Sequence, residues 1–106
     1  MSFPYITTSY VNGTSGYFIW SNGFKQQWGK TDVATSDAKI TVNLLKSFSN
    51  TNYFVLVSAQ CNDNEEIAGR IITINKTFQK GSFVIRNNGW TTQYNGVRAY
   101  WYACGY

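Results

Sequence analysis

The chain contains no histidine, and this absence removes several kinds of chemistry. Histidine is the usual general base of nucleophilic triads and the commonest metal ligand in proteins. The sequence also lacks a paired-cysteine metal motif and a glycine-rich phosphate-binding loop. We therefore expect no catalytic residues, no metal site and no cofactor, and we predict that the protein is not an enzyme.

Charged residues are scarce, at 13% of the sequence, and the basic ones are scattered without a run. The net charge is +4. Nucleic-acid-binding proteins gather their basic residues on one face, so we expect no nucleic-acid partner. No apolar run is long enough to cross a bilayer, and the N-terminus lacks the basic start and apolar core of a signal peptide. We therefore expect no membrane insertion.

The few acidic residues and cysteines suggest little further chemistry. Asp63 lies in the polar run of residues 62–66, which is typical of a solvated loop. The alternatives for this run are a calcium site of oxygen ligands and one side of a glycosidase carboxylate pair. Cys61 and Cys104 could pair, but without a secretory signal they are more typical of buried thiols. We expect both to be free.

Aromatic side chains are abundant, at 18% of the residues, and with the β-branched residues they favour pleated, half-buried strands. A chain of 106 residues is the size of one domain. No stretch has a sustained helical period, and turn signals recur every ten or so residues. The sequence therefore predicts an all-β fold, an antiparallel β-sandwich of about six to seven strands.

The first 15 residues are polar and predict an N-terminal arm or linker, which leaves residues 16–106 as the sandwich domain. Asn22-Gly23 predicts a hairpin turn. The alternation of Ile40, Val42 and Leu44 predicts a strand with one buried face. The predicted strands cover residues 16–20, 24–29, 39–44, 53–59, 69–75, 78–86 and 97–106.

Two segments are more apolar than a lone domain of this size can cover. Residues 53–59 are apolar on both faces at their start, which predicts a central strand covered on both sides. The last ten residues place Trp101, Tyr102 and Tyr106 at or near the carboxylate, although termini are usually polar. We therefore expect this terminus to pack into a core or against another chain, and we expect a partner subunit.

Trp90 and Tyr94 lie in a predicted loop that otherwise consists of asparagine, threonine, glutamine and glycine. Aromatic faces pack on the apolar faces of sugar rings, and flanking amides such as that of Asn95 bond hydroxyl groups. These residues are therefore candidate ligand-binding residues. The alternative is that Trp90 folds back to cap the edge of the sandwich.

Motifs in three parts of the chain, taken in order, resemble the gp53-like C-terminal domain of phage tail fibres. Gly16-Tyr17, Gly23 and Gln27-Trp28-Gly29 resemble its opening. Residues 48–53 with the valine-rich strand that follows resemble its middle, and residues 101–106 resemble its closing motif. The resemblance extends over residues 16–106.

This resemblance implies a β-sandwich at the distal end of a fibre, a homotrimer that contacts the bacterial surface. The strand pattern is also similar to that of H-type lectins, in which an arginine near the position of Arg70 helps to hold the sugar. The loop before the last strand contributes in those lectins, and Trp90, Tyr94 and Asn95 occupy it here. The lectins use a histidine in that loop, and this chain has none.

The function that we expect is therefore that of a receptor-binding tip, part of a virion and made in the host cytoplasm. Its partners would be two further copies, the rest of the tail fibre, and a bacterial surface glycan or other receptor. The candidate ligand-binding residues are Asp63, Arg70, Trp90, Tyr94 and Asn95. The alternatives are a structural trimerisation cap and a free-standing lectin.

Overall fold

The computed structural model describes residues 3–33, 39–60, 72–74, 77–87 and 97–106, which form eight strands. The strands are β1 (Ile6–Asn12), β2 (Ser15–Trp20), β3 (Lys25–Val33), β4 (Lys39–Asn43), β5 (Phe54–Gln60), β6 (Ile72–Ile74), β7 (Ser82–Asn87) and β8 (Val97–Gly105). No helix in these segments is long and apolar enough to cross a membrane.

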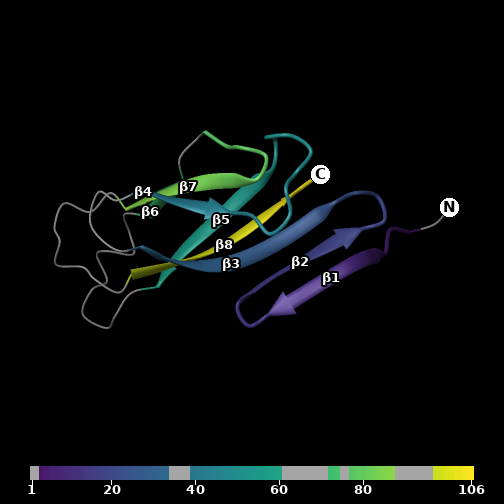
Figure 1. The fold of residues 1–106 in the computed structure, drawn as a ribbon, viewed down its shortest axis with the longest axis horizontal. Helices are drawn as coiled ribbons and strands as arrows, with labels where there is room; N and C mark the ends of the chain where they lie inside the picture. Colours follow the sequence, from purple (N-terminus) through teal and green to yellow (C-terminus); the bar gives the residue numbers. More distant parts are fainter. Residues whose placement is uncertain (1–2, 34–38, 61–71, 75–76, 88–96) are drawn as a thin grey trace.

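The strands form two antiparallel sheets, which confirms the predicted β-sandwich. The larger sheet has the order β1-β2-β3-β8-β5, and the smaller has the order β4-β7-β6. Figure 1 shows the smaller sheet over the β5 and β8 side of the larger one, while the β1–β2 hairpin extends to one side. The larger sheet is therefore wider than the layer that covers it.

The core lies between the two sheets. Its members are Val42, Phe48, Tyr53, Val55, Phe83, Ile85, Ala99, Trp101 and Ala103. The Phe83 ring meets the Trp101 ring edge-on, with centroids 5.5 Å apart. Burial of one such large side chain stabilises the fold by about 1.5–3 kcal/mol. The predicted buried face of β4 is confirmed, because Val42 is buried and both Ile40 and Leu44 pack against this core.

Tyr53 carries a polar group into this core. Its ring stacks between Phe48 and Phe78, with centroids 4.3 and 4.9 Å away. Its hydroxyl donates toward the carbonyl oxygens of Gln79 and Ser82, at 2.6 and 2.8 Å. Burial raises the pKa of the Tyr53 phenol above its ordinary value. The hydroxyl therefore stays protonated and ties β5 to the turn before β7.

Residues 6–12 differ from the sequence prediction, because they form a strand within the predicted arm. They pair with β2 from Ile6 opposite Trp20 to Asn12 opposite Ser15. All seven side chains are exposed, so backbone pairing is the main contact that holds β1 in place, with the Tyr10 ring stacked on Tyr17 at 5.7 Å. The turn to β2 uses Gly13 at φ 60°, a left-handed conformation that favours glycine. The polar sequence shows no sign of this strand, because none of its side chains belongs to the core.

β5 also differs from its prediction, because it is an edge strand and not a central one. Among the described strands it pairs with β8 alone, at the end of the larger sheet. Tyr53 and Val55 on one side are buried, whereas Phe54 and Leu56 on the other are 56% and 55% exposed. The apolar pattern predicted that both faces of this strand are buried. In the single chain, the face with Tyr53 and Val55 is buried and the face with Phe54 and Leu56 is exposed.

The C-terminus is packed as predicted. β8 lies between β3 and β5, and it pairs with both over most of its length. The carbonyl oxygen of Tyr106 accepts hydrogen bonds from the backbone N–H of Ser49 at 2.7 Å and from its hydroxyl at 2.9 Å. The Tyr106 ring meets Phe24 edge-on at 5.4 Å. The end of the chain is thus an internal strand of the larger sheet.

Candidate functional site

The predicted ligand-binding residues lie outside the described residues. They are Asp63, Arg70, Trp90, Tyr94 and Asn95. The described strand ends that flank their segments do lie together at one end of the sandwich. Gln60 pairs with Arg98 at the end of β5, and Ile72 pairs with Asn87 where β6 begins and β7 ends.

The larger sheet has an apolar face that points away from the smaller sheet. Side chains alternate between the two faces of a strand, so the neighbours of the core residues Val55 and Trp101 point outward. We call this the outer face, and its large side chains are Phe18, Trp20, Trp28, Phe54, Leu56, Tyr100 and Tyr102. Six of the seven are aromatic.

Hydrogen bonds across three strands order the middle of the outer face. The Trp20 indole Nε1 donates to Gln26 Oε1 at 2.7 Å, and Gln26 Nε2 donates to the Tyr102 hydroxyl at 2.8 Å. Beside this chain of bonds, the Phe18 and Trp28 rings meet edge-on at 5.1 Å. The polar groups of Trp20 and Tyr102 are therefore bonded within the sheet, and the apolar surfaces of these rings remain available.

The β5 side of the outer face is the least covered part. A shallow hollow of about 410 Å³ is lined there by Leu56, Ser58, Tyr100 and Tyr102, among others. Leu56 and Phe54 are more than half exposed, and Tyr100 is 39% exposed. Contiguous exposed apolar surfaces of this kind mark interaction sites on soluble proteins. The outer face is therefore suited to protein association.

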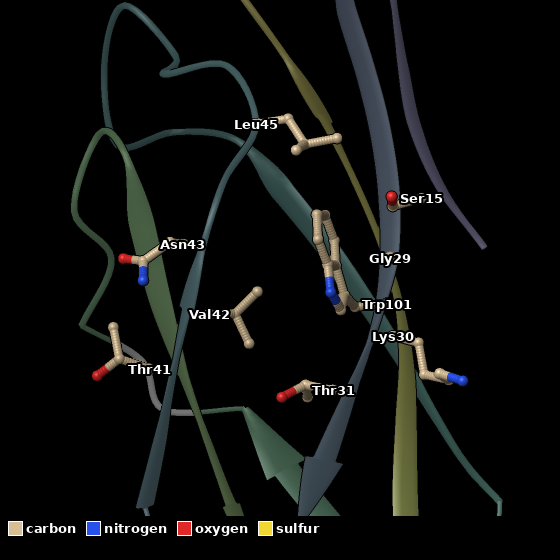
Figure 2. A pocket seen from close by; sticks show the side chains of 9 residues that line it. All are labelled: Ser15, Gly29, Lys30, Thr31, Thr41, Val42, Asn43, Leu45 and Trp101. Carbon is tan, nitrogen blue, oxygen red and sulfur yellow. The ribbon is translucent and has the colours of Figure 1, made fainter. Parts of the chain in front are cut away.

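A second hollow, of about 220 Å³, lies between the two sheets beside β4 (Figure 2). We call it the intersheet cleft, and it is lined by Ser15, Gly29, Lys30, Thr31, Thr41, Val42, Asn43, Leu45 and Trp101. β3 and the Trp101 ring form one wall, and β4, an edge strand of the smaller sheet, forms the other. The cleft therefore exists because the larger sheet extends beyond the smaller one.

Gly29 permits the close packing of Trp101 along the wall of the intersheet cleft. A Cβ atom at Gly29 would lie 2.7 Å from Trp101 Cζ2 and 2.9 Å from Nε1. Such contacts are shorter than real side chains tolerate, so a larger residue would displace the indole. Gly29 belongs to the sequence motif Gln27-Trp28-Gly29. The structure shows that a glycine is needed there because the Trp101 ring packs directly against it.

Gln27 holds the turn after β4 against β3. Its side chain is fully buried, and its amide bonds Lys46 twice: Nε2 donates to the Lys46 carbonyl at 2.7 Å, and Oε1 accepts from the Lys46 N–H at 3.1 Å. The Lys46 ammonium lies 5.2 Å from the centre of the Tyr17 ring. These contacts position Leu45 at the rim of the cleft.

The described residues include no group of three histidine, cysteine, aspartate or glutamate side chains that could hold a metal ion. Cys104 is a free thiol of intermediate exposure on β8. It lies opposite Phe54 and Gln26 in the register, on the outer face.

No protein-family model matches the chain, and a search of curated proteins finds no match. Solved structures do match. The C-terminal part of the P. aeruginosa R1 pyocin fiber is similar with a TM-score of 0.71 and 14% identity, over 93% of this chain and 28% of that one. An N-truncated R1-type pyocin tail fiber has the same TM-score and identity, over 93% of this chain and 84% of that one.

An N-truncated R2-type pyocin tail fiber is similar with a TM-score of 0.61 and 22% identity, over 93% of this chain and 37% of that one. The chain thus has the fold of these phage-tail-like fibre fragments, which confirms the expected fold of a tail-fibre C-terminal domain. It spans a little over a quarter of the C-terminal R1 pyocin fiber fragment, 28% of its length.

Proposed function

We propose that the protein is the receptor-binding tip of a phage tail fibre or of a phage-tail-like particle, and that it works as a homotrimer. The observation that carries this proposal is the outer face, a broad aromatic surface on a domain with the fold of pyocin tail fibers. A fibre tip must join its own copies along a common axis and still present another surface to the host.

The position of β5 supports association between copies. It has one neighbouring strand within the described part of the chain, and Phe54 and Leu56 leave more than half of their surface exposed. The side chains at the middle of the outer face are uncharged, so identical faces can approach without repulsion. Basic groups, such as Lys30 and Arg98, lie toward the other end of β3 and β8. In a closed ring, each copy would cover the neighbour's β5 with a different part of its own surface.

Receptor binding belongs, in this proposal, to the end of the sandwich where β5, β7 and β8 meet the remaining segments. Asp63, Arg70, Trp90, Tyr94 and Asn95 are the proposed contacts with a host surface glycan or other receptor. Each site would bind weakly, and the three sites of one tip together with several fibres on a particle would raise the overall affinity. The protein would act by binding alone, with no catalytic step and no cofactor.

Oligomeric state and adsorption test the two halves of the proposal separately. Light scattering on the isolated chain should give three times its mass of 12.0 kDa. A stable monomer in dilute solution would refute the trimer. Trp90→Ala and Tyr94→Ala should reduce adsorption of the assembled fibre to host cells while the mass stays that of a trimer. Unchanged adsorption would refute the assignment of the receptor contacts.

A structural cap is the second candidate, and the anchored C-terminus favours it. Tyr106 is bonded to Ser49, and β8 is flanked on both sides. A domain of this kind could end and align a trimer without contacting a receptor. The cap alone predicts that removal of residues 97–106 abolishes assembly and that Trp90 and Tyr94 variants adsorb like the wild type.

A further inference from the structure

We propose that the intersheet cleft binds one neutral sugar unit of a surface polysaccharide. This inference rests on the proposed function for the class of ligand, but it places a binding site on β3, β4 and β8, apart from the five residues assigned to the receptor above. Three observations support it: an indole donor that faces the cleft, the edge of β4 that no described strand pairs with, and the size and charge of the cleft.

The donor is the indole N–H of Trp101. The side chain is 6% exposed as a whole, and its Nε1 makes no hydrogen bond within the described parts of the chain. The Nε1 atom itself is not fully buried, so it is open to the cleft. Figure 2 shows this nitrogen at the end of the indole nearer to Thr31, beside the cleft between β3 and β4. An indole N–H can only donate a hydrogen bond. Water can accept from this donor, and an oxygen atom of a bound ligand would replace that water as the acceptor.

The free edge of β4 supplies further polar groups. The N–H of Leu44 donates to the carbonyl of Gly81 at 2.9 Å, on the side of β7. Because peptide groups alternate in direction along an antiparallel strand, those of Thr41 and Asn43 point to the other side, toward the cleft. Figure 2 shows that their side chains point away from Trp101, so these two residues offer the cleft their backbone.

The remaining walls combine the hydroxyl groups of Ser15 and Thr31 with apolar surface. The Ser15 hydroxyl donates to the Asn12 carbonyl at 3.2 Å. Figure 2 shows the Thr31 hydroxyl directed into the gap, where it can donate and accept. Val42, Leu45 and the Trp101 ring supply apolar contacts. A sugar ring has the same mixture, with apolar C–H faces and hydroxyl groups around its edge. Few polar groups at defined places in an apolar hollow are typical of small-ligand sites.

Size and charge narrow the ligand to one neutral ring. The volume of about 220 Å³ is several times the roughly 30 Å³ of one water molecule and below the roughly 300–1,000 Å³ of drug-sized sites. Lys30 is the single charged residue among the described lining residues, and Figure 2 shows its ammonium directed away from the indole. The described lining therefore places no positive charge in the cleft to bind a carboxylate or a phosphate group.

The indole N–H signals of the four tryptophans in an NMR spectrum of the full chain provide the test. Trp101 would be assigned with Trp101→Phe, and the wild-type protein would be titrated with glucose, galactose, mannose and N-acetylglucosamine. We expect one of them to move the Trp101 signal saturably, with a millimolar dissociation constant, and to leave the Trp20 signal in place. Trp20 is the matched control because its N–H is already bonded to Gln26.

Two threonine variants add a matched pair on facing strands. Thr31→Val keeps the shape of the side chain and removes the hydroxyl, so it should weaken sugar binding about three- to tenfold. Thr41→Val changes a side chain that points out of the cleft, so binding should stay within about twofold of the wild type. Equal effects of the two variants would overturn the site.

The outcomes separate this inference from the proposed function. If none of the four sugars moves the Trp101 signal while the fibre still adsorbs to cells, the cleft proposal is wrong and the receptor-binding proposal stands. If the Trp101 signal responds only to dissociation of the oligomer, a neighbouring copy occupies the cleft, and the proposal is also wrong. A saturable shift in a protein that does not adsorb would keep the sugar site and refute the fibre-tip function.

Discussion

Leu56→Lys should split the proposed trimer into folded monomers. Leu56 lies on the outer face of the edge strand β5, opposite Tyr102, and is 55% exposed in the single chain. Full burial of a leucine contributes about 1.5–3 kcal/mol, so covering the exposed half contributes about 1 kcal/mol in each copy. The variant loses that term three times, and it also brings three ammonium groups into an apolar interface, each at a cost of several kcal/mol unless paired.

The expected effect on assembly is therefore large, while the effect on the fold is small. A total loss of about 4 kcal/mol or more corresponds to at least a thousandfold shift toward monomers, since each 1.4 kcal/mol is a factor of about ten. Within one chain the lysine stays in solvent, and an exposed change of this kind alters stability by about 0.5 kcal/mol or less. The circular dichroism spectrum and the unfolding midpoint should hence remain close to those of the wild type.

Leu45→Lys is the matched control for this prediction. Leu45 is 42% exposed, but it lies at the intersheet cleft and not on the outer face. The same chemical change there should leave the mass in light scattering at three times 12.0 kDa over the concentration range in which Leu56→Lys gives 12.0 kDa. If Leu56→Lys keeps the trimer mass throughout that range, the outer face is not the subunit interface.

Three further changes test the packing of the chain by denaturant unfolding. Tyr53→Phe keeps the stacked ring and loses the hydroxyl bonds, which should cost about 1–2 kcal/mol. Because the folded pKa of Tyr53 is raised above 10.0, the wild type should lose stability as the pH rises above 10.0, and the variant should lack that part of the loss. Gly29→Ala should cost about 1–3 kcal/mol as its methyl group displaces Trp101, whereas Gly81→Ala, which meets only a serine hydroxyl, should cost less. Gln27→Leu should cost about 1–3 kcal/mol, since both backbone groups of the turn after β4 lose their partner. Wild-type stability in any of these variants would contradict the corresponding contact.

Local signals accounted for most of the strands. The alternation of residues 39–44 predicted both β4 and its buried side, and Asn22-Gly23 predicted the turn between β2 and β3, where Gly23 has a φ of 92°. β1 was missed because its seven exposed side chains carry no hydrophobic pattern. A strand that is held mainly by backbone bonds to its neighbour shows little pattern in the sequence.

The sequence predicted the outer face in part, whereas it gave no sign of the intersheet cleft. The double apolar pattern around Phe54 and Leu56 predicted that a partner is needed, although it could not show that β5 lies at an edge. The intersheet cleft had no counterpart in the sequence, because Thr31 and Trp101 come from distant strands. Their proximity follows from the pairing of β3 with β8 and from the narrower sheet above them.

The sequence by itself determined the all-β class, the packing of the C-terminal segment and the excess of apolar surface. These properties follow from alternation and composition, which act over a few neighbouring residues. Only the tertiary structure decided which apolar face is left uncovered and that the Trp101 indole N–H faces the cleft between the two sheets. Those outcomes depend on strand order and on the unequal widths of the two sheets, and both are set by contacts between residues far apart in the chain.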